Sequence, residues 1–150
     1  MKNVKIFFNE PKEFTLKNIE SLAGITGLYF IFLKAFAIRY PFKSSKLIYI
    51  GMSEKRTNSI GNRLANHYNG KSGNTGLSNY RKIEKLYFTH ISFEMLKKIW
   101  KHKIEDLESY FILDFTEKYG VYPICNNKTG FEILNNDLDV KLEIDWRYFE

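Results

Sequence analysis

The chain contains 150 residues, of which 44% are hydrophobic, 17% aromatic and 27% charged, and its formal net charge is +6. This composition excludes a disordered chain and predicts one globular domain over residues 1–150, which buries roughly two-thirds of the surface that the unfolded chain exposes. The sequence lacks both a run of roughly 20 apolar residues and the apolar region of a signal peptide, which excludes a membrane helix and predicts a cytoplasmic protein.

The first part of the sequence predicts a strand, a helix and an antiparallel hairpin. The run VKIFF at 4–8 is typical of a short strand, and TLKNIESL at 15–22 is typical of a helix with Thr15 as its N-cap. The runs GLYFIFLKAF at 27–36 and KLIYIGM at 46–52 are apolar at consecutive positions, as expected for strands that are covered on both faces. We expect these two strands to pair antiparallel, with a long connection between them.

The middle of the sequence predicts a helix followed by a loop. Ile60, Leu64 and Tyr68 are four residues apart, so they share one face of a helix, and Gly70 is placed to end it. The run KSGNTGLSN at 71–79 is rich in Gly, Ser and Asn, and it predicts a loop.

The last part predicts a strand, a long helix and a final strand. The second half of YRKIEKLYFTHISFE at 80–94 alternates as a strand does, and a helix is expected from about Lys101 to Lys118. The run DVKLEIDWRYF at 139–149 predicts an edge strand. This order predicts an α/β (α+β) fold in which helices flank a small central sheet of mixed or antiparallel strands.

The long helix carries a carboxylate on its apolar side. At about 100° per residue, Glu108 lies roughly 40° from Ile104 and falls inside the apolar arc of the helix. The arc consists of Ile104, Leu107, Phe111, Ile112 and Phe115. Because an unpaired buried carboxylate is costly, Glu108 needs a cation, which is either a metal or a basic side chain in a purely structural ion pair.

Basic residues are concentrated before and at the start of this helix. Residues 55–103 contain eleven Lys or Arg residues and two acids, whereas residues 131–150 contain six acids and two bases. A basic field attracts polyanions, although an ordinary solvated surface looks the same in a sequence. Arg63 and His67 are four residues apart, so they share a helix face and can reach one phosphate or one water. The single cysteine, Cys125, excludes an internal disulfide and is expected to be buried.

These features resemble the GIY-YIG nuclease family in their order along the chain. The resemblance covers residues 27–127. It is carried by GLY at 27–29, YIG at 49–51, an arginine with a histidine four residues later, a helix glutamate, and PICN at 123–126. The family includes nuclease modules of homing endonucleases, the incision module of bacterial excision repair and several small restriction enzymes. The positions that match its site are Tyr29, Tyr49, Arg63, His67, Glu108 and Asn126.

The resemblance implies metal-dependent hydrolysis of a phosphodiester bond. Glu108 would hold a divalent cation, Mg²⁺ or Mn²⁺, and Arg63 would offset the charge that builds up on the phosphate. Either Tyr29 or Tyr49 would take the proton of the attacking water, and both hydroxyls would line the site. His67 would either accept that proton onward or fix the tyrosine and the water in place.

Other residues have supporting roles in this interpretation. Asn126 would brace the site through hydrogen bonds to the backbone, and Gly51 would leave room beside the tyrosines. Lys55, Arg56 and Lys71 are candidates for contacts along the backbone of the nucleic acid, which we expect to be double-stranded DNA.

Three features depart from the family pattern. The first motif reads GLY instead of GIY, an exchange of aliphatic residues that leaves the tyrosine in place. The connection between the two motifs is longer than in compact members and suggests an added loop for substrate recognition, as in the restriction branch. The acidic extension at 128–150 is too short to be the separate DNA-binding domain of homing enzymes. We therefore expect a restriction-type or mobile-element enzyme.

Two alternatives remain at this stage. One is a catalytically inactive nucleic-acid-binding protein on a nuclease scaffold, and the other is a structural or partner-binding domain in which Glu108 forms an ion pair. The joint presence of Arg63, His67 and Glu108 favours an active enzyme over the first alternative.

Overall fold

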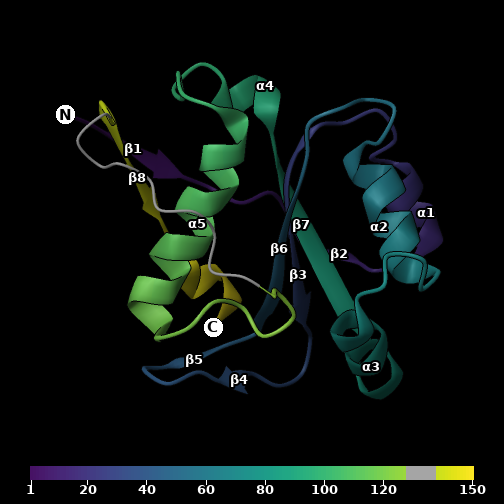
Figure 1. Cartoon of the computed structure of the whole chain (residues 1–150). Coiled ribbons are helices and arrows are strands. Elements are labelled where there is room, and N and C mark those ends of the chain that lie inside the picture. Colours follow the sequence, from purple (N-terminus) through teal and green to yellow (C-terminus); the bar gives the residue numbers. More distant parts are fainter. Residues whose placement is uncertain (128–137) are drawn as a thin grey trace.

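The computed structural model describes residues 1–127 and 138–150 (Figure 1). Its central sheet has four strands in the order β2–β7–β3–β6, and every neighbouring pair is antiparallel. The strands are β2 (Lys12–Glu13), β7 (Leu86–Ser92), β3 (Gly27–Leu33) and β6 (Leu47–Ser53). The antiparallel pairing predicted for the two apolar runs is confirmed, and it leaves β6 at one edge of the sheet.

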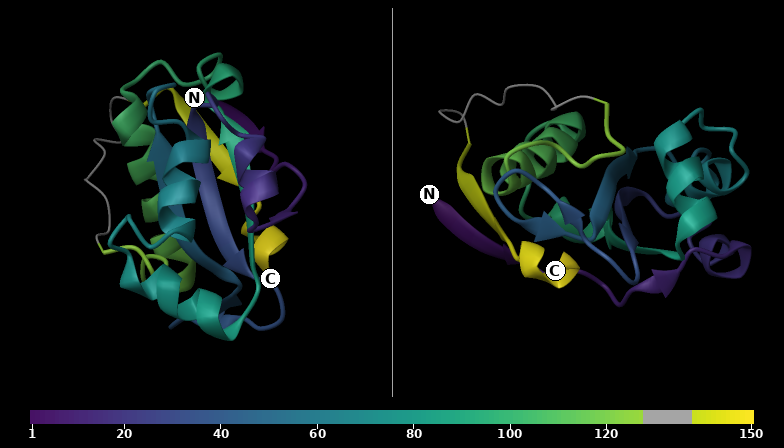
Figure 2. Two further views of the ribbon diagram at one scale, coloured as in Figure 1. Left: turned by 90° about the vertical axis from the view of Figure 1, so that its right-hand side faces the viewer. Right: turned by 90° about the horizontal axis from the view of Figure 1, so that it is seen from below.

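Helices cover both faces of this sheet, as the two further views also show (Figure 2). On one face lie α1 (Leu16–Glu20), α2 (Ile60–Tyr68) and α3 (Thr75–Ile83). On the other lie α4 (Phe93–Leu96) and α5 (Ile104–Tyr119). The predicted α+β class with helices flanking an antiparallel sheet is confirmed. No helix in the described ranges is long and apolar enough to cross a membrane.

The side chains of β3 alternate between two buried clusters, one on each face of the sheet. The set that packs with α5 consists of Leu28, Phe30 and Phe32. The set that packs with α1, α2 and α3 consists of Tyr29, Ile31 and Leu33. Every residue of β3 is buried, which explains why this strand is apolar at consecutive positions instead of alternate ones.

Helix boundaries follow local capping. The Thr15 hydroxyl accepts a hydrogen bond from the Asn18 amide at the start of α1, so the predicted cap is confirmed. Ser59 caps α2 in the same way, and α2 ends two residues before Gly70. The long helix begins at Ile104, three residues later than expected, and extends to Tyr119.

The prediction of a loop at 71–79 is wrong, because α3 begins within it at Thr75. The side chain of Asn74 accepts a hydrogen bond from the Leu77 amide and so caps the helix. Leu77 is buried against α2, and this contact stabilises a helix whose Gly, Ser and Asn content alone favours a loop.

The two end segments of the described chain form a separate sheet. β1 (Lys2–Ile6) pairs in parallel with β8 (Val140–Ile144). We expected the C-terminal strand at an edge of the central sheet, and this prediction is wrong, because the strand belongs to the second sheet. β1 also begins two residues earlier than predicted. Alternate residues of β8 are buried, and together with the short helix η2 (Trp146–Phe149) they join the cluster on the α5 face. The central sheet therefore keeps its β6 edge open to other contacts.

Candidate active-site cleft

A cleft of about 640 Å³ lies beside β6, the edge strand of the central sheet. Because α2 and α5 cover opposite faces of the sheet, side chains from both helices reach this edge. The residues matched to the nuclease family that line the cleft are Tyr49, Arg63, His67, Glu108 and Asn126. Residues that are distant in the sequence therefore meet at the carboxylate that the helix pattern singled out.

The two motif tyrosines differ in their access to this cleft. Tyr49 is partly exposed and lines it, whereas Tyr29 is 1% exposed and is buried between β3 and α2. The centroids of their rings are 6.0 Å apart. The expectation that both hydroxyls line the site is correct for Tyr49 only, because Tyr29 lies on an inner strand of the sheet and Tyr49 lies on its edge.

The motif glycines make room for close contacts between strands. Gly51 on β6 pairs with Tyr29 on β3, and a Cβ atom on Gly51 would overlap the ring and the hydroxyl of Tyr29. A Cβ atom on Gly27 would overlap the carbonyl oxygen of Ile91 on β7. Gly51 thus leaves room for the Tyr29 side chain, as the sequence suggested.

We expect Gly51→Ala to destabilise the protein by about 1–3 kcal/mol, because the added methyl group forces the buried Tyr29 ring out of its position. Urea unfolding measures the free energy that Gly51→Ala costs, once in the wild-type protein and once in a protein that also carries Tyr29→Ala. The cost of the alanine should be much smaller once the Tyr29 ring is removed. An equal cost in both backgrounds would show that the methyl group meets a different obstacle.

His67 is held at both ring nitrogens. Its Nε2 lies 3.0 Å from the Tyr29 hydroxyl, and its Nδ1 lies 2.7 Å from the Ser72 hydroxyl. The side chain is 8% exposed, and burial, together with the positive charge of Arg63, lowers the pKa of His67 to about 4. His67 is therefore neutral at physiological pH, with one ring nitrogen as a donor and the other as an acceptor.

Opposing influences act on the Tyr49 hydroxyl. Burial is the largest and raises its pKa, and the negative charge of Glu108 adds to this rise. A hydrogen bond from the Tyr29 hydroxyl and the positive charge of Arg63 act in the other direction, since both favour the phenolate. Burial raises the pKa of Tyr29 much further, followed by the effect of Tyr49. Of the two tyrosines, Tyr49 is the one that lines the cleft, and its pKa is raised less than that of Tyr29.

Arg63 and Glu108 bring opposite charges to the cleft from the two sides of the sheet. Arg63 is exposed on α2, and Glu108 is partly buried on α5. Glu105, three residues before Glu108, is exposed. Such a cleft can attract a phosphate through the guanidinium group and a cation through the carboxylate.

The donors in the cleft suit magnesium better than zinc. Among the residues that the structure describes, no three His, Cys, Asp or Glu side chains gather to hold a metal ion. Zinc usually needs at least three protein ligands, whereas Mg²⁺ is commonly held by one or two carboxylates together with waters and the phosphates of a substrate. Glu108 fits this second pattern.

Asn126 closes the open edge of β6. Its side-chain amide donates to the Ile50 carbonyl at 2.9 Å and its side-chain carbonyl accepts from the Ile50 amide at 3.0 Å. The backbone amide of Cys125 adds a bond of 2.8 Å to the Ile48 carbonyl. Asn126 thus fixes the backbone between Tyr49 and Gly51, in agreement with the bracing role expected for it.

Comparison with protein-family models, curated proteins and solved structures finds no match to this chain. The GIY-YIG resemblance therefore rests on the motif residues, their order along the chain and their meeting at one cleft.

The long connection between the motifs contacts Ile124, one of the residues that line this cleft. It forms a small ribbon of β4 (Ile38–Arg39) and β5 (Ser44–Ser45) beside the end of α5. Tyr40 is buried there, and its hydroxyl donates to the Leu47 carbonyl at 2.6 Å and accepts from the Ile124 amide at 3.0 Å. Tyr40 thereby ties β6 to the segment that carries Asn126, a link that nothing in the sequence pattern indicated.

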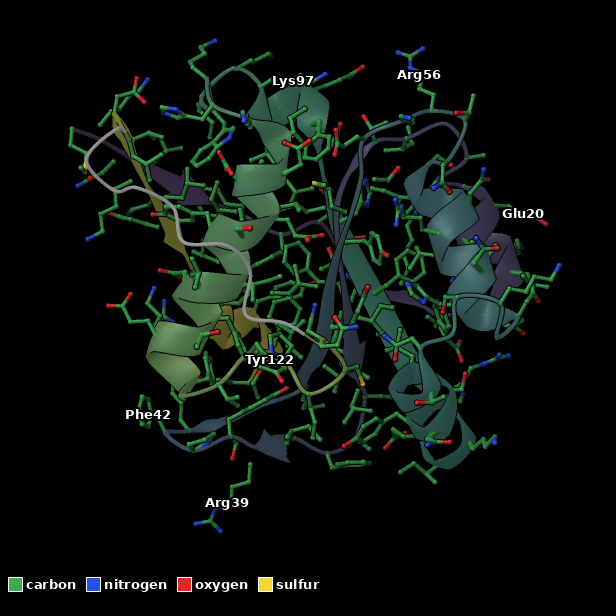
Figure 3. All side chains as sticks on the ribbon, in the orientation of Figure 1. Glu20, Arg39, Phe42, Arg56, Lys97 and Tyr122 are labelled. Carbon is green, nitrogen blue, oxygen red and sulfur yellow. The ribbon has the colours of Figure 1, made fainter. Side chains whose placement is uncertain are left out.

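The predicted basic contacts are exposed, and the fold adds others. Lys55, Arg56 and Lys71 are exposed on the loops before and after α2, although none of them lines the cleft itself. The loop that leads into α5 carries four further exposed lysines, which are Lys97, Lys98, Lys101 and Lys103. This loop and the loop after β6 lie at one end of the sheet, where Arg56 and Lys97 are labelled (Figure 3). In the described part of the chain, these four lysines form no ion pair with a carboxylate.

Proposed function

We propose that this chain is a metal-dependent endonuclease of the GIY-YIG type, acting in the cytoplasm on phosphodiester bonds of double-stranded DNA. The observation that supports this proposal most strongly is the meeting of Tyr49, Arg63, His67 and Glu108 in one cleft, supplied by β6, α2 and α5. These side chains provide a base, a guanidinium group for phosphate and a carboxylate for a cation, which are the groups that hydrolysis of a phosphodiester needs.

Glu108 would hold the cation, Mg²⁺ or Mn²⁺. When bound, such an ion polarises the scissile phosphate and stabilises the leaving oxygen. Arg63 binds the same phosphate and offsets the charge that develops on its oxygens. Arg63 is exposed, so it reaches a substrate without any rearrangement of α2.

Tyr49 serves as the general base in this mechanism. The proton of the attacking water would pass to Tyr49 in its phenolate form, which burial and the Glu108 charge disfavour and which the Tyr29 hydroxyl and the Arg63 charge favour. The buried Tyr29 acts through Tyr49 and does not touch the substrate. Asn126 keeps the backbone on both sides of Tyr49 in place.

The basic loops at one end of the sheet would contact the DNA backbone. Gly27, at the start of β3, pairs with Ser53 at the end of β6 and with Ser92 at the end of β7. The loops that follow β6 and β7 therefore leave the same end of the sheet. They carry Lys55, Arg56 and the four lysines before α5. Phosphate contacts of this kind position a duplex without reading its sequence. A restriction-type or mobile-element role fits a chain that carries its basic surface on the nuclease fold itself.

Incubation of the purified protein with supercoiled plasmid tests the proposal. We expect nicked and linear products with Mg²⁺ or Mn²⁺, and we expect chelation of the metal by EDTA to stop the reaction while the protein still retards DNA in a gel. Retardation without any cleavage would instead support the catalytically inactive nucleic-acid-binding protein. A failure to bind DNA even at low salt would contradict both functions.

A further inference from the structure

A chain of hydrogen-bonding side chains leads away from Tyr49 through the interior of the protein. The Tyr49 ring lies beside that of Tyr29, with their centroids 6.0 Å apart, and the Tyr29 hydroxyl lies 3.0 Å from His67 Nε2. His67 Nδ1 lies 2.7 Å from the hydroxyl of Ser72. Tyr29 and His67 are buried, whereas Ser72 is exposed on the loop between α2 and α3 and lines the cleft.

The groups of this chain can share their protons in two arrangements with equal numbers of hydrogen bonds. In the first, Tyr49 donates to Tyr29, Tyr29 donates to Nε2 of His67, and Nδ1–H of His67 donates to Ser72. In the second, Ser72 donates to Nδ1, Nε2–H donates to Tyr29, and Tyr29 donates to Tyr49. The two arrangements differ in the tautomer of a neutral His67, and Tyr49 is a phenol in the first and a phenolate in the second.

We propose that Ser72, His67 and Tyr29 form a proton path through which Tyr49 releases its proton to solvent, with Ser72 as the positioning residue at the outer end. This inference rests on the proposed role of Tyr49 as the general base. Passage from the first arrangement to the second moves one proton at each step: Tyr49 to Tyr29, Tyr29 to Nε2, Nδ1 to Ser72, and Ser72 to water. The balance is one phenolate on Tyr49 and one proton in solvent, and every group between them is neutral before and after.

The surroundings of Ser72 suit this position. Its hydroxyl oxygen accepts a hydrogen bond from the backbone amide of Asn74 at 3.3 Å. The side-chain amide of Asn74 donates to the Cys125 carbonyl at 3.0 Å. The backbone amide of Lys71 is bound to the Asn66 carbonyl at 2.8 Å, which ties the loop to α2. The loop thus keeps Ser72 within reach of His67.

Two substitutions distinguish the contribution of the Ser72 hydroxyl from that of the Ser72 backbone. Ser72→Ala removes the outer end of the path, and Ser72→Thr keeps a hydroxyl there. We expect Ser72→Ala to lower the single-turnover cleavage rate roughly tenfold with unchanged DNA affinity, a part of the 10²–10⁴-fold range of general base catalysis. Ser72→Thr should restore the rate. Ser78→Ala, on α3 outside the cleft, is the matched control and should cleave as the wild type does.

A second readout does not depend on cleavage. The ¹⁵N chemical shifts of the His67 ring nitrogens report which of them carries the proton, and His90 and His102 are the other histidines to assign. We expect these shifts to change in Ser72→Ala and to return in Ser72→Thr. A rate and a His67 spectrum that are both unchanged in Ser72→Ala would overturn the proton path. A wild-type protein that binds but does not cleave DNA would contradict the proposed function, and the His67 spectra would then still decide whether Ser72 sets the tautomer.

Discussion

Glu108→Gln should abolish Mg²⁺-dependent cleavage of plasmid DNA while leaving DNA affinity nearly unchanged. The substitution keeps the shape of the side chain in the wall of the cleft but removes the charge that would hold the cation. Removal of a single hydrogen-bond donor from a transition state typically costs about 10²–10³-fold in rate, and we expect loss of the cation to cost at least that much. Single-turnover cleavage and gel retardation on the same samples provide the two measurements.

Glu105→Gln is the matched control for this substitution. It makes the same chemical change three residues earlier on α5, at an exposed position outside the cleft, and it should cleave normally. Thermal unfolding of both variants shows whether either change disturbs the fold. Undiminished cleavage by Glu108→Gln would exclude Glu108 as a metal ligand. A parallel loss of cleavage and thermal stability would indicate that Glu108 has a structural role instead.

Arg63→Ala should lower the single-turnover rate by about 10²–10³-fold, because in the proposed mechanism the guanidinium group stabilises charge that is largest in the transition state. DNA affinity should change far less. Arg63→Lys keeps the positive charge but loses the planar pair of donors, so we expect it to recover only part of the rate. If affinity and rate fall together, Arg63 contributes to binding and not specifically to the transition state.

Two further measurements accompany the Arg63 substitutions. The charge of Arg63 lowers the pKa of His67 in addition to burial, so an NMR titration should show a higher His67 pKa in Arg63→Ala. This readout tests the contact between the two groups without any cleavage. Arg39→Ala removes an exposed arginine at the opposite end of the molecule from Arg56 and serves as the control (Figure 3). It should leave both the rate and the His67 titration unchanged.

Local patterns in the sequence predicted much of the fold. The consecutive apolar residues of β3 and β6, the Thr15 cap and the four-residue spacing on α2 each reflect contacts between near neighbours in the chain. The arc on α5 likewise predicted that Glu108 would face inward, although it could not show which elements would meet it there. Pairing of β1 with β8 depends on residues at the two ends of the chain, and no local pattern determines such a contact.

The sequence indicated which residues form the candidate site but not which of their side chains are buried. The family resemblance matched both Tyr29 and Tyr49 to the site, and only the order of the strands places Tyr29 on an inner strand and Tyr49 on the edge. Ser72 lies in a run whose composition suggested a loop, and the role proposed for it depends on a contact with His67 that folding of the loop creates. Tyr40 is a similar case, because its two hydrogen bonds join segments that are far apart in the sequence.

The contacts of Asn126 with Ile50 also bear on association between molecules. An uncovered β-strand at the margin of a sheet offers its peptide groups to strands of other molecules and promotes aggregation. Asn126 and the Cys125 amide occupy these groups on β6, so a neighbouring molecule cannot add a strand beside Tyr49. The same asparagine that holds the backbone of the cleft therefore protects the protein against self-assembly at that strand.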